Sequence, residues 1–296
     1  MISSKDFLRK NLKVIQGYPM INPFAIIWEN MRKFQSKPDD IIIATYPKSG
    51  TTWISEILDM ILNEGEIEIC NRDFITNKVP MLEMYAPGLR ASGIDLLEKT
   101  PSPRLVKTHL PIDLLPKSFW ENKCKMIYLA RNAKDVAVSY YNFSLMNSLN
   151  PLPGTWGEFL EKFITGEVAY GSWFKHVKSW WEKKKEYPVL YIFYEDLKEN
   201  PKQEIKKIIQ FLGKTLNDEI LQKIIHHTSF EVMKDNPMVN YTHLPCVLMD
   251  HSQSAFMRKG ITGDWKNYFT VAQNEKFDAI YEKEMSGSGL LIRTEI

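Results

Sequence analysis

Four short apolar runs, rich in β-branched and aromatic residues, constrain the fold more than any other feature of this chain. They are Ile41–Tyr46, Arg104–Thr108, Met126–Ala130 and Val189–Tyr194. Each run is nearly continuous in apolar residues, which is typical of parallel strands that are covered on both faces of a sheet. We therefore expect an α/β fold with a central parallel sheet.

Helical patterns separate these runs. Apolar residues recur at helical spacing from Trp53 to Leu62, and Gly65 offers a stop. Further helices are predicted over 135–146, 156–164, 173–181, 201–212, 218–226 and 273–285. Strands that alternate with helices indicate a doubly wound sheet, which binds ligands at the carboxyl ends of its strands. Residues 236–262 lack periodicity and are predicted to form a long functional loop. We expect one domain over residues 1–296.

Composition excludes several classes of protein. The net charge of +2 is too small to indicate a nucleic-acid partner. Cys70, Cys124 and Cys246 are odd in number and far apart, which speaks against a disulfide framework or a zinc site. No apolar run reaches the roughly 18 residues of a membrane span, and the first residues lack the apolar core of a signal peptide. We expect a cytoplasmic protein with no zinc site and no membrane contact.

The first predicted strand runs directly into Pro47-Lys48-Ser49-Gly50-Thr51-Thr52-Trp53 and a helix. A helix amino terminus offers unpaired N–H groups and partial positive charge to an anion. Lys48 adds a full charge, Gly50 permits close approach, and the hydroxyls add donors. A plain helix cap by Ser49 or Thr51 is the structural alternative. Because Lys48 precedes the glycine, this is not the loop of a nucleotide triphosphatase.

Two further segments supply charged side chains at strand ends. Lys107 and His109 share one face of the second strand, where a lysine can neutralise a transferred group and a neutral imidazole can accept a proton. Arg131 ends the third strand and, with Ser139 in the next helix, could clamp a phosphate. The alternatives are a structural Lys107–His109 pair and an Arg131–Asp135 cap. In the long loop, Arg258-Lys259-Gly260 is either solvated surface or part of a ligand lid.

Taken together, these segments resemble the cytosolic sulfotransferases. The resemblance covers essentially the whole chain and rests on TYPKSGTTW at 45–53, LVKTHLP at 105–111, YLARNAKDVAVSYY at 128–141 and FMRKGITGDWKNYF at 256–269. The phenol-type group, and within it the thyroid-hormone and phenol-sulfating branch, is the most similar. The resemblance implies the single-domain α/β sulfotransferase fold with a P-loop-like phosphosulfate-binding loop, and a role in xenobiotic and hormone metabolism.

The resemblance also implies the reaction and the donor site. A sulfuryl group would pass in line from 3′-phosphoadenosine 5′-phosphosulfate to the hydroxyl of a small phenol, an iodothyronine or a catechol, without a metal. His109 would be the general base, Lys48 and Lys107 would stabilise the transition state, and Ser139 would restrain Lys48. The residues implied in donor binding are Lys48, Ser49, Gly50, Thr51, Thr52, Trp53, Arg131, Ser139, Tyr194, Thr228, Phe230, Arg258, Lys259 and Gly260.

For the acceptor and the assembly, the resemblance implies two further sets of residues. The acceptor pocket would be lined by Phe24, Met81, Met84, Leu89, Lys107, His109, Phe143, Tyr241, Leu248 and Met249. Its methionines form an adaptable wall. A short dimerisation motif would comprise Lys266, Thr270, Val271 and Glu275, which indicates a homodimer.

Two other functions share part of this pattern. A nucleoside kinase would use the same sheet and anion loop, but it needs magnesium ligands and a differently placed lysine. A non-catalytic binder of adenosine phosphates would need the anion loop alone, and Lys48, Lys107 and His109 together speak against it.

Overall fold

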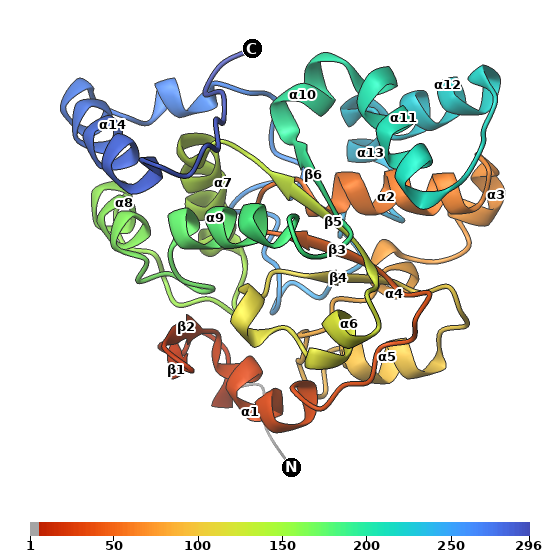
Figure 1. Cartoon of the computed structure of the whole chain (residues 1–296). Coiled ribbons are helices and arrows are strands. Elements are labelled where there is room, and N and C mark those ends of the chain that lie inside the picture. The colour runs from red at the N-terminus through yellow and green to blue at the C-terminus, as the bar shows by residue number, and fades with distance from the viewer. Residues whose placement is uncertain (1–5) are drawn as a thin grey trace.

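The computed structural model describes residues 6–296. Its centre is a four-stranded parallel sheet in the order β4-β3-β5-β6 (Figure 1). The strands are β3 (Ile41–Thr45), β4 (Leu105–Thr108), β5 (Lys125–Ala130) and β6 (Val189–Phe193). All four strands were predicted from their apolar runs, and the parallel α/β architecture is confirmed. Tyr194, predicted as the end of the last strand, is instead the first residue of a helix.

Helices cover both faces of the sheet because alternate strand residues enter different cores. In β3, Ile41 and Ile43 belong to one core, whereas Ile42 and Ala44 belong to the other. The first core contains residues of α2 (Thr51–Leu62), α11 (Pro201–Leu212) and α12 (Asp218–His227). The second contains residues of α1 (Asn22–Met31), α6 (Lys117–Glu121), α7 (Ala133–Met146), α8 (Trp156–Thr165), α9 (Trp173–Lys183) and α14 (Val271–Met285).

Several short elements lack a sequence signal that predicts them. They are β1 (Lys13–Ile15), β2 (Tyr18–Met20), α3 (Ile67–Cys70), α4 (Ile75–Lys78), α5 (Gly93–Lys99), α10 (Tyr194–Glu199), α13 (Phe230–Asp235), and the 3-10 turns η2 (Ile112–Leu114) and η3 (Asp264–Asn267). Each spans one or two turns or three residues, too few to show a period. The predicted long loop is confirmed, because no helix lies between Asn236 and Thr262.

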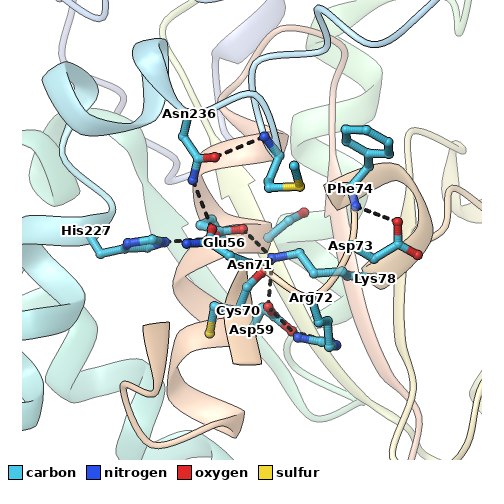
Figure 2. Close-up of polar contacts among 12 residues, drawn as sticks. Glu56, Asp59, Cys70, Asn71, Arg72, Asp73, Phe74, Lys78, His227 and Asn236 are labelled. Atoms are coloured by element: carbon cyan, nitrogen blue, oxygen red, sulfur yellow. Dashed lines mark hydrogen bonds and ion pairs between the residues drawn. The ribbon is translucent and has the colours of Figure 1, made fainter. Parts of the chain in front are cut away.

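A buried charge cluster fixes the helix that follows the anion loop. The ammonium of Lys78 lies 3.0 Å from Glu56 and 2.9 Å from Asp59, and all three side chains are almost fully buried (Figure 2). Lys78 also donates to the Cys70 carbonyl. His227 lies 3.0 Å from the second oxygen of Glu56, and Arg72 lies 2.8 Å from Asp59. These contacts tie α2 to α4 and to the end of α12.

Parallel strands place their carboxyl ends at one edge of the sheet. β3 lies between β4 and β5. After β3 the chain forms β4 on one side of it and then crosses to form β5 on the other side. Ala44 pairs with Thr108 and with Tyr128, which brings the segments after these strands together. Such a reversal of strand order is where doubly wound sheets bind ligands.

Candidate active site

A cavity of about 240 Å³ lies at this edge of the sheet. Almost all of the side chains predicted for donor and acceptor line it. Of the residues predicted for the donor and the acceptor, Ser49, Phe24 and Leu89 do not line it. Phe24 lies instead in the core on the inner face of α1, with its ring 5.7 Å from that of Trp28.

The anion loop has the backbone geometry of a ligand cradle. Lys48 has φ of 69° and Gly50 has φ of 102°, both in the left-handed region. A Cβ on Gly50 would lie 2.9 Å from the Tyr194 ring, so the site needs glycine there. Gly50 caps α2 without any side-chain hydrogen bond, and the buried Ser49 hydroxyl has no partner among residues 6–296. The plain side-chain cap is therefore absent, and the first turn of α2, whose residues Thr51, Thr52 and Trp53 line the cavity, receives no hydrogen bond from a capping side chain.

Lys48 carries its ammonium between two aromatic rings. The nitrogen lies 4.1 Å from the Phe143 centroid and 4.2 Å from that of Phe256. Burial, followed by the charges of Arg131 and Arg258, lowers the Lys48 pKa to about 7. An anion in the cavity would oppose this shift, because it favours the charged ammonium.

His109 is held in one tautomer. Its Nδ1 lies 2.9 Å from the Thr45 carbonyl and 3.0 Å from the Thr45 hydroxyl. The carbonyl can only accept, whereas the hydroxyl can donate or accept, so both contacts are satisfied when Nδ1 carries the hydrogen and Nε2 of the neutral ring is unprotonated. Burial lowers the His109 pKa to about 3, against the effect of the Thr45 hydrogen bond. The His109 amide donates to Glu83 over 2.7 Å, and its carbonyl accepts from His176 over 3.0 Å.

Lys107 lies beside the same cavity. Its ammonium donates to the Tyr241 hydroxyl over 3.2 Å, and that hydroxyl also accepts from Thr52 over 3.3 Å. Burial on its own raises the Tyr241 pKa, but the Lys107 charge and these hydrogen bonds outweigh it and leave the pKa lowered. Lys107 and His109 therefore point into one cavity together with Lys48, as the strand-end pattern predicts.

Two segments, one with Arg131 and one with Arg258 and Lys259, bring further cations to the cavity wall. Arg131 donates to the carbonyls of Lys48 and Ile261 at 3.3 and 2.9 Å, and lies 4.3 Å from the Tyr194 ring centroid. The Arg131 guanidinium lies 4.0 Å from the Asp135 carboxylate, which is too long for a hydrogen bond, so a cap pair with Asp135 does not explain the position of Arg131. Arg258 and Lys259 each bind Asp264 at 2.5 Å. Two cations share one carboxylate, which leaves positive charge in excess.

Buried donors without partners indicate what this region can bind. Among residues 6–296, the Nε atoms of Arg131 and Arg258 and the Thr262 hydroxyl are buried with no hydrogen bond. Unpaired buried donors are uncommon in folded proteins, and a phosphate would satisfy several at once. Gly260 packs so closely on the Phe230 ring that a Cβ would lie 2.2 Å from it. This region fits the 3′-phosphate of the implied donor.

Aromatic side chains lie next to these cations, as an adenine pocket requires. The ring of Trp53 lies 5.2 Å from that of Tyr194, edge to face. Thr228 is buried at the end of α12, where it donates to the Ile224 carbonyl over 2.7 Å, and Phe230 follows in α13. Ser139 of α7 lines the same cavity as Lys48 and Arg131.

Several residues that line the cavity or support His109 were not predicted as site residues from the sequence. Glu83 binds the His109 amide and the Thr108 hydroxyl, and burial raises its pKa to about 7. His176 supports His109 from α9, and Phe256 covers Lys48 from the long loop. Arg90 also lines the cavity. These residues belong to loops and a helix face whose position depends on the tertiary fold.

Other features bear on metals, membranes and thiols. Over residues 6–296, no group of three or more His, Cys, Asp or Glu side chains is arranged to hold a metal ion. In the same range no helix has the length and apolarity to cross a membrane. Cys70, Cys124 and Cys246 are all free thiols.

Comparisons with known proteins agree with this geometry. The sulfotransferase domain model matches residues 38–289. Sulfotransferase 1B1 of dog (Canis lupus familiaris) is 75% identical over 100% of both chains, and that of mouse (Mus musculus) is 70% identical over 100% of this chain and 99% of its own. A mouse sulfotransferase crystallised with PAP, 34% identical, superposes with a TM-score of 0.77 over 94% of this chain and 95% of its own. A retinol dehydratase complex with retinol and PAP, 27% identical, has a TM-score of 0.83 over 94% and 90%.

Proposed function

This chain belongs to the sulfotransferase family and transfers a sulfuryl group from 3′-phosphoadenosine 5′-phosphosulfate to the hydroxyl of a phenolic acceptor, and we propose that His109, Lys48 and Lys107 carry the chemistry. The observation that supports these roles most is the His109 tautomer. Nδ1 is committed to the Thr45 carbonyl, so Nε2 is the free base in a cavity that also holds both lysines.

Each residue has a distinct part in the proposed mechanism. His109 Nε2 takes the proton of the acceptor hydroxyl. The lowered pKa keeps the imidazole neutral, and an anionic donor beside Lys48 and Lys107 would raise that pKa and so make the base stronger. The donor supplies the sulfuryl group, whose sulfur forms a bond to the acceptor oxygen as its bond to the 5′-phosphate oxygen breaks. Lys48 and Lys107 neutralise the charge that develops on the transferred group and on the leaving phosphate. Ser139 restrains Lys48.

The same cavity supports a proposed donor site. The loop Lys48–Trp53 with the amino terminus of α2 would hold the 5′-phosphosulfate, as helix termini hold anions. Arg131, Ser139 and the segment Arg258–Gly260 would hold the 3′-phosphate through the unpaired Nε donors. Trp53, Tyr194, Thr228 and Phe230 would hold the adenine.

We propose that the acceptor binds where mainly apolar side chains line the cavity. Phe143 and Tyr241 supply rings, and the remaining wall consists of Met81, Met84, Leu248 and Met249. A flat ring gains aromatic contact from the first two, while the methionines adapt to substituents. We propose that the acceptors comprise simple phenols, iodothyronines and catechols.

A direct assay distinguishes the candidate functions. The protein is incubated with labelled phosphosulfate donor and p-nitrophenol in the presence of a chelator, and sulfated phenol is measured. Metal-independent product formation is the expected result. A kinase would make no sulfated product and would need ATP with magnesium, and a binder would hold the nucleotide without turnover.

Arg258→Ala should weaken binding of donors with a 3′-phosphate far more than that of adenosine 5′-phosphosulfate, which lacks it. A hydrogen bond to a charged group contributes roughly 1.5–3 kcal/mol, so the selectivity for the 3′-phosphate should fall by roughly 10- to 100-fold. Titration calorimetry with both nucleotides measures this ratio. Equal weakening of both would show that Arg258 only orders the loop through Asp264.

We also infer a single-domain, cytoplasmic homodimer that contacts its partner through Lys266, Thr270, Val271 and Glu275. Val271 begins α14 with 76% of its surface exposed, and among the large apolar side chains of residues 6–296 only Leu291 is more exposed. Thr270 caps the helix through a capping box with Gln273, so the segment is ordered in one chain. An exposed valine on a fixed helix end suits a small symmetric contact.

Val271→Glu should give an active monomer. A carboxylate at a two-fold contact meets its own copy and loses water, and both effects disfavour association. Size-exclusion chromatography with light scattering gives the mass, and Val271→Ile is the matched control that keeps the contact apolar. A dimer of unchanged mass in the glutamate variant would place the interface elsewhere.

A further inference from the structure

Arg90 lies on the wall of the cavity, on a loop that is fixed at both ends. At its start, the Leu82 amide donates to the Lys107 carbonyl over 2.9 Å. At its end, Gly93 packs against the Met81 carbonyl so closely that a Cβ would lie 1.7 Å from it. A tight turn closes the loop, with the Arg90 amide bonded to the Ala86 carbonyl over 3.1 Å. These contacts hold the backbone that carries Arg90 next to strand β4.

The guanidinium of Arg90 has no partner in the described chain. Each of the other arginines within residues 6–296 makes a side-chain hydrogen bond or an ion pair; they are Arg9, Arg32, Arg72, Arg104, Arg131, Arg258 and Arg293. Arg90 makes neither with any residue of that range. A guanidinium on a cavity wall that has no partner in the protein is free to pair with an anionic group of a ligand.

The charge of Arg90 acts on neighbouring titratable groups. Burial lowers the Arg90 pKa against the opposing effect of Tyr241. The Arg90 charge in turn contributes, after burial, to the lowered pKa of His243, and it also acts to lower that of Tyr241. Tyr241 receives the Lys107 hydrogen bond on its hydroxyl. Tyr241 thus interacts both with the lysine next to His109 and with Arg90.

We propose that Arg90 binds a carboxylate carried by the acceptor, so that the preferred acceptors are phenols with an acidic group on a side chain away from the hydroxyl. This inference rests on the proposed acceptor site. The acceptor hydroxyl lies at His109, the ring lies among Phe143 and the methionines, and the carboxylate accepts two parallel N–H bonds from the planar guanidinium. Such bidentate pairing is specific to arginine and is stronger than a neutral hydrogen bond.

The test compares matched acceptors in matched variants. The ratio of kcat/KM for 3-(4-hydroxyphenyl)propanoate to that for its primary amide is measured in the wild type, Arg90→Gln, Arg90→Lys and the surface control Arg293→Gln. A charged hydrogen bond corresponds to roughly 10- to 100-fold. We expect the ratio to fall by that factor in Arg90→Gln, to fall less in Arg90→Lys, and to stay unchanged in Arg293→Gln.

A second measurement needs no variant. 3-Phenylpropanoate and 3-phenylpropanamide are compared as competitive inhibitors of p-nitrophenol sulfation by the wild-type protein, and the acid should have the lower inhibition constant. The proposal is overturned if the acid and the amide inhibit equally, or if Arg90→Gln keeps the wild-type ratio. The proposed function fails separately, because in that case the wild type would sulfate neither acceptor nor p-nitrophenol.

Discussion

His109→Ala should lower kcat for phenol sulfation by roughly 10²–10⁴-fold, the usual contribution of a positioned general base. The reason is the loss of Nε2, the one nitrogen of the ring that the Thr45 carbonyl leaves free to accept a proton. The proposed donor contacts lie on the anion loop and on the segments around Arg131 and Arg258. Donor binding should therefore survive, and calorimetry with adenosine 3′,5′-bisphosphate measures it.

Two controls separate the base from its scaffold. His109→Asn keeps an N–H that can donate to Thr45 but has no basic nitrogen, so its kcat should fall as far as that of the alanine variant. The same change at the exposed His226 of α12 should leave kcat unaltered. If nucleotide binding disappears together with activity in both His109 variants, His109 shapes the site and does not act as the base.

The sheet could be predicted from the sequence because its strands are buried on both faces. A short, nearly continuous apolar run such as Ile41–Thr45 is typical of a strand that is buried on both faces of a parallel sheet. Tyr194 was less predictable, since an aromatic residue suits a strand end and a helix start equally well. The short elements depend on tertiary contacts: Gly93 starts α5 where its lack of a side chain lets it pack on the Met81 carbonyl.

The same distinction applies to the site. Lys48, Lys107 and His109 follow or end neighbouring strands, so the topology alone brings them together. Glu83 and His176 support His109 from outside the sheet, and nothing in their local sequence points to that role. Phe24 was assigned to the acceptor wall by resemblance; it packs in the core beside Ile27 and Met31 and does not line the cavity, and its contact with the acceptor stays a prediction.

Lys78→Met should destabilise the protein by about 3–5 kcal/mol, because removing one partner of a buried ion pair leaves buried charge uncompensated. The Lys78 ammonium contacts both Glu56 and Asp59, and its side chain is 0% exposed (Figure 2). His227 and Arg72 still bind these carboxylates after the change, which favours the lower end of the range. Methionine fills most of the lysine volume, so the loss reflects charge more than an empty cavity.

Urea unfolding followed by tryptophan fluorescence measures the free energy of unfolding, and Lys223→Met is the matched control. Lys223 lies 3.4 Å from Glu219 on the surface of α12, with 50% and 78% of the side chains exposed. Such a pair contributes less than about 1 kcal/mol, so the control should unfold at nearly the wild-type urea concentration. Equal midpoints for Lys78→Met and Lys223→Met would show that the cluster does not stabilise the fold. A lower midpoint for Lys78→Met alone would identify the cluster as the anchor of α2, the helix whose amino terminus forms the anion loop.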